Sequence, residues 1–153
     1  MFSYRHAFHA GNHADVLKHT ALIALMKYLT QKNTALTVID THAGAGLYRL
    51  DGDYTETSGE AQEGIFKLLS ASKTSVAHTG RASTAIKPVA TTPDASGYAW
   101  APALQDYLDM LRDLNPHFAQ TGDPAHLKIY PGSPFIEQKF LSGRDKLDRK
   151  SVV

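Results

Sequence analysis

The fold of this chain depends on one stretch, Val38-Ile39-Asp40-Thr41-His42-Ala43-Gly44-Ala45-Gly46. The run 35–39 that leads into it is short, largely apolar and rich in β-branched residues, which predicts a strand buried on both faces. Asp40 closes this strand, and Gly44 and Gly46 lie in the following loop, where a missing side chain lets the backbone approach a ligand closely. Ligands of α/β proteins bind at this carboxyl edge of a sheet. The stretch is therefore a candidate binding loop.

Two common nucleotide-binding patterns are excluded at this loop. A dinucleotide fingerprint requires a third glycine at the position of Arg49, and a phosphate-binding P-loop ends in Gly-Lys-Ser/Thr. The pattern that remains, a strand followed by Asp, three residues, Gly, one residue and Gly, resembles the first motif of S-adenosylmethionine-dependent methyltransferases. The same spacing also fits an ordinary strand-to-helix turn, and spacing alone does not separate these interpretations.

Other elements follow from periodicity and capping residues. A helix is expected from His13 to Gln31 with Asn12 as its N-cap. Its predicted buried stripe is Leu17, Ala21, Leu25 and Tyr28 or Leu29. The further expected elements are a helix that starts at the capping box Thr57/Glu60 and buries Ile65, Leu68 and Leu69, a helix Pro102–Leu114, a second strand His126–Tyr130 parallel to the first, and a helix capped by Ser133. The charged run 144–150 shows no pattern.

Composition bounds the class of protein. The chain has 153 residues, 42% of them hydrophobic, which suits a single domain with a core. A net charge of +1 does not by itself indicate a nucleic-acid binder, and zero cysteines exclude disulfides and thiolate metal sites. The longest apolar run, Ala21–Met26, is far below the about 20 residues of a membrane span. We expect a soluble, cytoplasmic protein without a membrane segment.

The N-terminal segment concentrates polar and aromatic residues. Four histidines fall in the first nineteen residues, but His9 and His13 are separated by a Gly-Asn break and no HExxH pattern occurs, which disfavours a metal site. Tyr4, Phe8 and Arg5 offer stacking faces and a positive charge that suit a splayed-out base. These residues either gather at one pocket or serve as caps and surface groups.

Three blocks carry a resemblance to a known family. Residues 4–19, residues 40–46 and Tyr130-Pro131-Gly132-Ser133-Pro134 closely resemble, in the same order, the N-terminal portion of the bacterial 23S rRNA (adenine-N6)-methyltransferase J family, RlmJ. The resemblance implies an incomplete, Rossmann-like α/β methyltransferase fold with a small helical insertion. It divides the chain into 1–50, an inserted subdomain 51–122 with a flexible Ser/Thr/Ala-rich stretch 70–97, and a truncated return to the methyltransferase domain at 123–153.

The resemblance also implies a site and its partners. S-adenosyl-L-methionine would be the cofactor and 23S rRNA the substrate, with no metal, no membrane contact and a monomeric state. The residues implied to bind the cofactor are Lys18 (close to its carboxylate), His19, Asp40, His42, Gly44, Gly46 and Ser133. The residues implied to contact RNA are Tyr4 and Arg5.

One expected feature is missing from these residues. Adenine-N6 methyltransferases carry an Asp- or Asn-Pro-Pro-Tyr motif, and none of the seven prolines here is adjacent to another. We therefore assign no catalytic residue and expect a truncated rRNA-processing enzyme that does not turn over. The alternative is a non-catalytic RNA-binding module that uses the basic, aromatic N-terminus. A metal-dependent hydrolase built on the histidines is a third and weaker interpretation.

Overall fold

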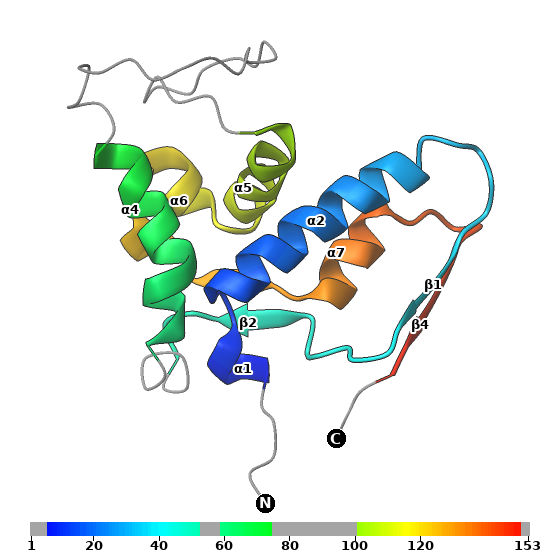
Figure 1. Cartoon of the computed structure of the whole chain (residues 1–153), viewed down its shortest axis with the longest axis horizontal. Helices are drawn as coiled ribbons and strands as arrows, with labels where there is room; N and C mark the ends of the chain where they lie inside the picture. The colour runs from blue at the N-terminus through cyan, green and yellow to red at the C-terminus, as the bar shows by residue number, and fades with distance from the viewer. Residues whose placement is uncertain (1–5, 53–58, 75–100, 151–153) are drawn as a thin grey trace, which may run out of the picture.

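The computed structural model describes residues 6–52, 59–74 and 101–150, and these form a mixed α/β structure (Figure 1). Tyr4, Arg5, Thr57 and most of the stretch 70–97 lie outside the described residues. The helical elements are α1 His6–His9, α2 His13–Leu29, the π-helix η1 Gln62–Phe66, α4 Lys67–Thr74, α5 Pro102–Leu114, α6 Pro116–Thr121, the 3₁₀ turn η3 Pro124–His126 and α7 Ser133–Phe140. The strands are β1 Thr37–Asp40, β2 Leu47–Arg49, β3 Ile129–Pro131 and β4 Lys146–Arg149.

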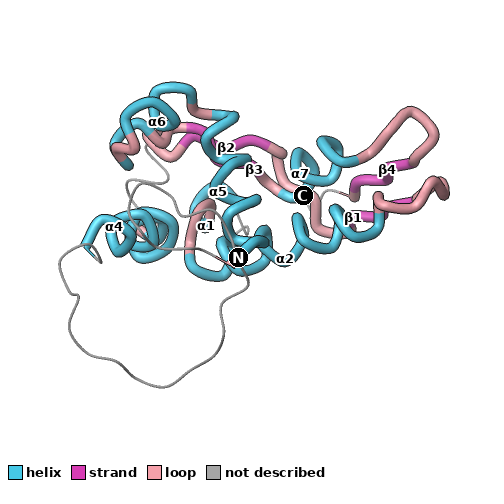
Figure 2. Tube along the Cα trace, turned by 90° about the horizontal axis from the view of Figure 1, so that it is seen from above, coloured by secondary structure: helices cyan, strands magenta, loops and turns pink. Residues whose placement is uncertain are grey.

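The four strands form two separate pairs. β1 runs parallel to β4, with Thr37 opposite Lys146, and β2 runs antiparallel to β3, with Leu47 opposite Pro131. The β1–β4 pair lies at one end of the described structure and α4 and α6 lie at the other, with α2 and α5 between them (Figures 1 and 2). The mixed α/β class with a parallel strand pair is as expected. The predicted second strand His126–Tyr130 is shorter than expected, since only Ile129–Pro131 forms β3, and β3 pairs antiparallel with β2 instead of lying in one parallel sheet with β1.

The charged run 144–150 forms β4, which its side chains did not indicate. Backbone atoms build this pair: the Lys146 amide donates to the Leu36 carbonyl at 2.9 Å, and the Lys150 amide donates to the Asp40 carbonyl at 2.8 Å. The Asp145 carboxylate accepts from the Leu36 amide at 2.9 Å and so fixes the start of the strand. The prediction that β1 is buried on both faces is wrong, because its residues alternate between exposed and half-buried.

Helix α2 begins as predicted and buries a different face. The Asn12 side-chain oxygen accepts from the Asp15 amide at 2.8 Å, which confirms the N-cap. The predicted buried stripe is wrong, since Leu17 is 73% exposed and Leu25 52% exposed. The buried residues are instead His19, Ile23 and Met26. Apolar residues occupy every position from 21 to 26, so their spacing does not single out one face of the helix.

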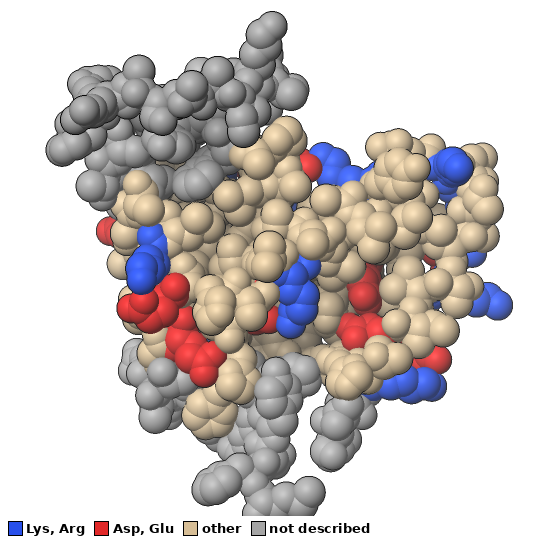
Figure 3. Space-filling model, viewed as in Figure 1, with Lys and Arg blue, Asp and Glu red and all other residues tan. Residues whose placement is uncertain are grey.

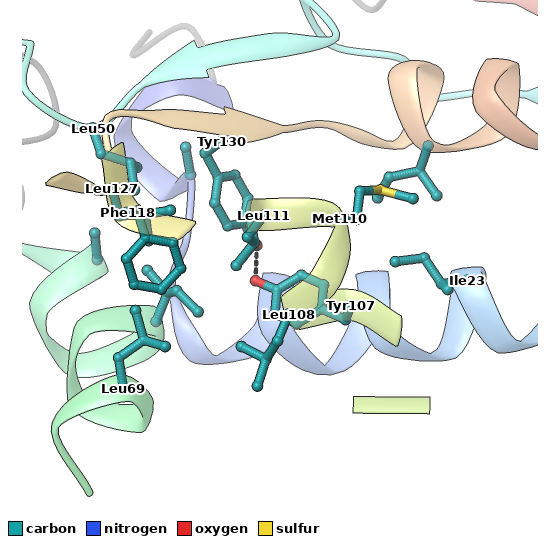
Figure 4. Packing of buried hydrophobic residues seen from close by; sticks show 14 residues of the cluster. Ile23, Leu50, Leu69, Tyr107, Leu108, Met110, Leu111, Phe118, Leu127 and Tyr130 are labelled. Atoms are coloured by element: carbon teal, nitrogen blue, oxygen red, sulfur yellow. Dashed lines mark hydrogen bonds between the residues drawn. The ribbon is translucent and has the colours of Figure 1, made fainter. Parts of the chain in front are cut away.

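The core joins α5 to the elements around it. Helix α5 has the predicted bounds, and its Tyr107, Leu108 and Leu111 are almost fully buried. Figure 4 shows these side chains packed with residues from α2, α4, α6 and β3. Inside this cluster the Tyr107 hydroxyl donates to the Tyr130 hydroxyl oxygen at 2.9 Å. Tyr130, at the centre of β3, is thereby held from the helical side of the molecule.

Asn115 locks the same region through its buried amide. Its NH₂ group donates to the carbonyls of Leu111 at 2.9 Å and Ile129 at 2.8 Å. Its oxygen accepts from the amides of Lys128 at 3.0 Å and Ile129 at 2.8 Å. One side chain therefore satisfies backbone groups at the end of α5 and at the start of β3.

Replacing Asn115 with Ala should lower the free energy of unfolding by about 2–4 kcal/mol, because it leaves buried backbone groups without partners. Urea titration of both proteins measures this difference. Asn33→Ala is the matched control, since Asn33 is exposed and bonds only the exposed Arg144 guanidinium among the described contacts. Equal losses for the two variants would show that the buried amide has no special role.

Candidate functional site

A cavity of about 760 Å³ lies between α2, β1 and the start of α7. Figure 3 shows the molecule hollowed on this face, with acidic surface inside the hollow. The wall combines apolar side chains of α2 and β1 with polar groups from three segments of the chain. The lining residues are His9, Asp15, Lys18, His19, Ala21, Leu22, Leu25, Ile39, Asp40, Thr41, His42, Gly44, Tyr48, Gly132, Ser133 and Glu137.

Asp40 joins the two loops that form one wall of the cavity. One carboxylate oxygen accepts from the Ser133 hydroxyl at 2.7 Å, and the other accepts from the His42 amide at 3.0 Å. Next to this contact the Gly132 amide donates to the Gly46 carbonyl at 2.6 Å. The predicted cap at Ser133 is wrong: Gly132 is the N-cap of α7, and the Ser133 hydroxyl instead binds the charged Asp40, which is the stronger acceptor.

The loop after β1 can lie this close because of its glycines. Gly46 has φ +88°, a conformation that L side chains rarely adopt. A Cβ atom on Gly132 would lie 3.0 Å from the Tyr48 ring, which leaves little room for any other residue there. The Tyr48 hydroxyl in turn accepts from the Ala45 amide at 3.1 Å. These contacts hold the loop against the β3–α7 turn.

His19 forms part of the cavity wall as a neutral ring. It is 2% exposed, and its Nδ1 lies 3.2 Å from the Tyr130 hydroxyl. Burial lowers the pKa of His19 to about 4, and the nearby Lys18 acts in the same direction while Asp15 and Asp40 oppose it. The Tyr130 oxygen already accepts from Tyr107, so its own hydrogen is available for Nδ1. The imidazole is therefore a hydrogen-bonding group at neutral pH and not a cation.

Two of the predicted residues, Lys18 and His42, present exposed polar side chains at the cavity. Lys18 is bound to Asp15 at 2.7 Å, and its side chain remains 63% exposed. The Asp15 side chain is only 15% exposed, so it is the Lys18 ammonium that faces the cavity and solvent. The His42 ring has its Nδ1 2.8 Å from the Thr41 hydroxyl and is exposed. Both side chains are thus available to a ligand.

His9 and Glu137 are polar groups of the cavity that were not among the predicted site residues. His9 binds Glu60 through Nδ1 at 2.9 Å, and Asn12 donates to the same carboxylate at 2.9 Å, which lowers the Glu60 pKa. Glu137 is 5% exposed and lies on α7 one turn after Ser133. A glutamate four residues after a site serine shares its helix face, and this spacing was the available signal. Among the described residues, no cluster of three or more metal-ligating side chains occurs.

The structure brings most of the predicted site residues together. Those that line the one cavity are Lys18, His19, Asp40, His42, Gly44 and Ser133. Gly46 adjoins it through its backbone bond to Gly132. Tyr4 and Arg5 lie outside the described residues. The binding roles of all these residues remain predictions, but the shared position of the six cavity residues is a property of the fold.

The buried His19 should make folding sensitive to acid. Its pKa is about 4 in the folded protein and near 6.5 when unfolded, so the unfolded chain binds more protons as the pH falls from 7 to 5. We expect His19 to contribute a loss of about 2 kcal/mol of unfolding free energy over that range. Urea titrations at both pH values on the native chain and His19→Gln measure it. The exposed His117→Gln is the control, and an equal pH dependence in all three proteins would refute the assignment.

The chain is similar to known ribosomal RNA methyltransferases. The family model described as "Ribosomal RNA large subunit methyltransferase D, RlmJ" matches residues 33–104. Ribosomal RNA large subunit methyltransferase J of Escherichia coli (strain K12) is 35% identical over 148 residues, which is 96% of this chain and 41% of that protein. The protein of the same name from Haemophilus influenzae Rd is 50% identical over 68 residues, 44% of this chain and 24% of its own length. The chain thus spans less than half of these curated relatives.

A solved structure shares the fold. The crystal structure of a Legionella pneumophila protein of the DUF519 family superimposes with a TM-score of 0.62 and 25% sequence identity, over 95% of this chain and 41% of that one. The mixed α/β arrangement is therefore consistent with part of a methyltransferase fold of this type.

Within the described residues, no helix is long and apolar enough to cross a membrane.

Proposed function

The chain belongs to the RlmJ family, and from this premise we propose that it is part of an S-adenosylmethionine-dependent rRNA methyltransferase whose cofactor binds in the cavity beside α2. The observation that carries the proposal is the meeting of three distant segments at one wall. Lys18 and His19 come from α2, Asp40 ends β1 and is followed by the loop to Gly44, and Ser133 begins α7.

The wall has the chemistry that such a cofactor requires. S-adenosylmethionine supplies an activated methyl group on a sulfonium, and it carries a flat adenosine and a charged amino-acid end. Leu22, Leu25 and Ile39 offer apolar surface for the nucleoside. Lys18 offers a ligand carboxylate a positive charge, because its own side chain is 63% exposed at the cavity. The neutral His19 and the exposed His42 supply hydrogen-bonding groups beside it.

We extend the proposal to the target of methylation. The family resemblance assigns adenine N6 of 23S rRNA, with Tyr4 and Arg5 as RNA contacts. These 153 residues contain no adjacent prolines and hence no Pro-Pro-Tyr segment that would hold the target amino group. We therefore assign to this part of the protein the cofactor half of the active site, at the carboxyl end of β1 where α/β folds bind ligands.

Calorimetric titration with S-adenosylhomocysteine, the demethylated product, tests the assignment. We expect the native chain to bind it and Ser133→Ala to bind about tenfold more weakly, because the variant loses the hydroxyl that orients Asp40. Ser70→Ala is the matched control, since Ser70 is exposed on α4 and should leave the affinity unchanged. Thermal unfolding of each variant checks that the fold is intact.

The titration also has outcomes against the proposal. A native chain that shows no heat of binding at millimolar ligand, yet retains an rRNA fragment at moderate salt, would favour a non-catalytic RNA-binding module instead. Equal affinity in the native chain and Ser133→Ala would remove the Asp40 wall from the binding site.

A further inference from the structure

Glu137 is a carboxyl group that the proposed site does not yet use. It lies on α7, lines the cavity and is 5% exposed, yet its Oε2 has no hydrogen-bond partner among the residues that the structure describes. A buried polar atom without a partner lowers stability, and native proteins keep few of them. The position of Glu137 at the wall of a cavity suggests that a ligand supplies the missing donor.

The groups around Glu137 leave its side of the cavity short of positive charge. Asp40, on β1, is a second acid that acts on it, and Arg149, on β4, is the cation that opposes Asp40. Helix α2, which packs against α7, contributes to the same cavity the neutral His19 and the mutually paired Lys18 and Asp15. Burial, reinforced by Asp40, raises the pKa of Glu137 to about 7 despite Arg149.

A partner that is both cationic and a hydrogen-bond donor would satisfy Oε2 and balance the two carboxyl groups. The proposed cofactor has two positive groups at neutral pH. Its sulfonium has no N–H or O–H and cannot donate a conventional hydrogen bond to Oε2. Its α-ammonium has three N–H donors and a full charge. A ligand carboxylate is excluded from this position by repulsion from Glu137 and Asp40 and is better placed at Lys18.

We propose that Glu137 binds the α-ammonium group of the amino-acid end of the cofactor and selects ligands that carry this group. This inference rests on the proposed function, since it requires S-adenosylmethionine or its product to occupy the cavity. Glu137 then acts as a specificity-determining residue: the ligand neutralises the acidic pair and provides the hydrogen bond that Oε2 lacks.

The test combines one substitution with one change in the ligand. S-adenosylhomocysteine and its analogue without the amino group are titrated calorimetrically into the native chain, Glu137→Gln and Glu63→Gln. Glu63 is an exposed glutamate paired with Lys67 and serves as the control. We expect Glu137→Gln to weaken S-adenosylhomocysteine about tenfold and to leave the affinity for the analogue unchanged. Glu63→Gln should alter neither affinity.

A second readout follows the proton of Glu137. With a pKa of about 7, the unliganded carboxyl is largely protonated at pH 6, and an ammonium group favours its charged form. Binding should therefore release a proton and strengthen as the pH rises from 6 to 8. Titrations in buffers of different ionisation enthalpy count that proton. In Glu137→Gln the pH dependence and the proton release should both disappear.

The outcomes separate this inference from the proposed function. Binding by the native chain with equal affinity in Glu137→Gln would overturn the role of Glu137 and leave the cofactor assignment standing. Equal weakening of both ligands would show a structural effect and would also overturn it. Failure of the native chain to bind S-adenosylhomocysteine at all would refute both proposals.

Discussion

The candidate site depends on the carboxylate of Asp40. It holds the Ser133 hydroxyl at 2.7 Å and the His42 amide at 3.0 Å, and so connects the loop after β1 to the turn before α7 across 93 residues of sequence. The backbone bond from Gly132 to Gly46 runs beside it. The Asp40–Ser133 contact ties the end of β1 to the start of α7, and the Gly132–Gly46 bond continues the β2–β3 pairing by one residue.

Local patterns predicted the elements better than their partners. The N-cap at Asn12 and the bounds Pro102–Leu114 follow from backbone requirements that a few neighbouring residues satisfy. The strand Lys146–Arg149 is held by backbone hydrogen bonds to its neighbour β1, and these bonds require no particular side chains. Its residue types therefore did not predict a strand. The buried face of α2 was missed for a similar reason, because apolar residues surround the helix and only its packing against α5 and α7 selects His19, Ile23 and Met26.

In the site, too, the sequence predicted which residues lie together better than it predicted their interactions. The family resemblance selected six residues that share one cavity, and of these the residues themselves pointed to the loop that follows Asp40. The sequence did not reveal the state of each group. Burial makes His19 neutral, the binding of Asp40 turns Ser133 away from capping, and the isolation of Glu137 appears only when α7 packs against β1 and β4. These properties depend on the surroundings that tertiary packing creates, and residue type alone does not determine them.

The most direct measurement is a crystal structure of the chain with S-adenosylhomocysteine. The account predicts the ligand in the cavity between α2 and β1, with its carboxylate near Lys18, its ammonium group within hydrogen-bond distance of Glu137 and its nucleoside against the apolar wall. A ligand bound elsewhere, or an empty cavity at saturating ligand concentration with the lining residues free of crystal contacts, would contradict the account.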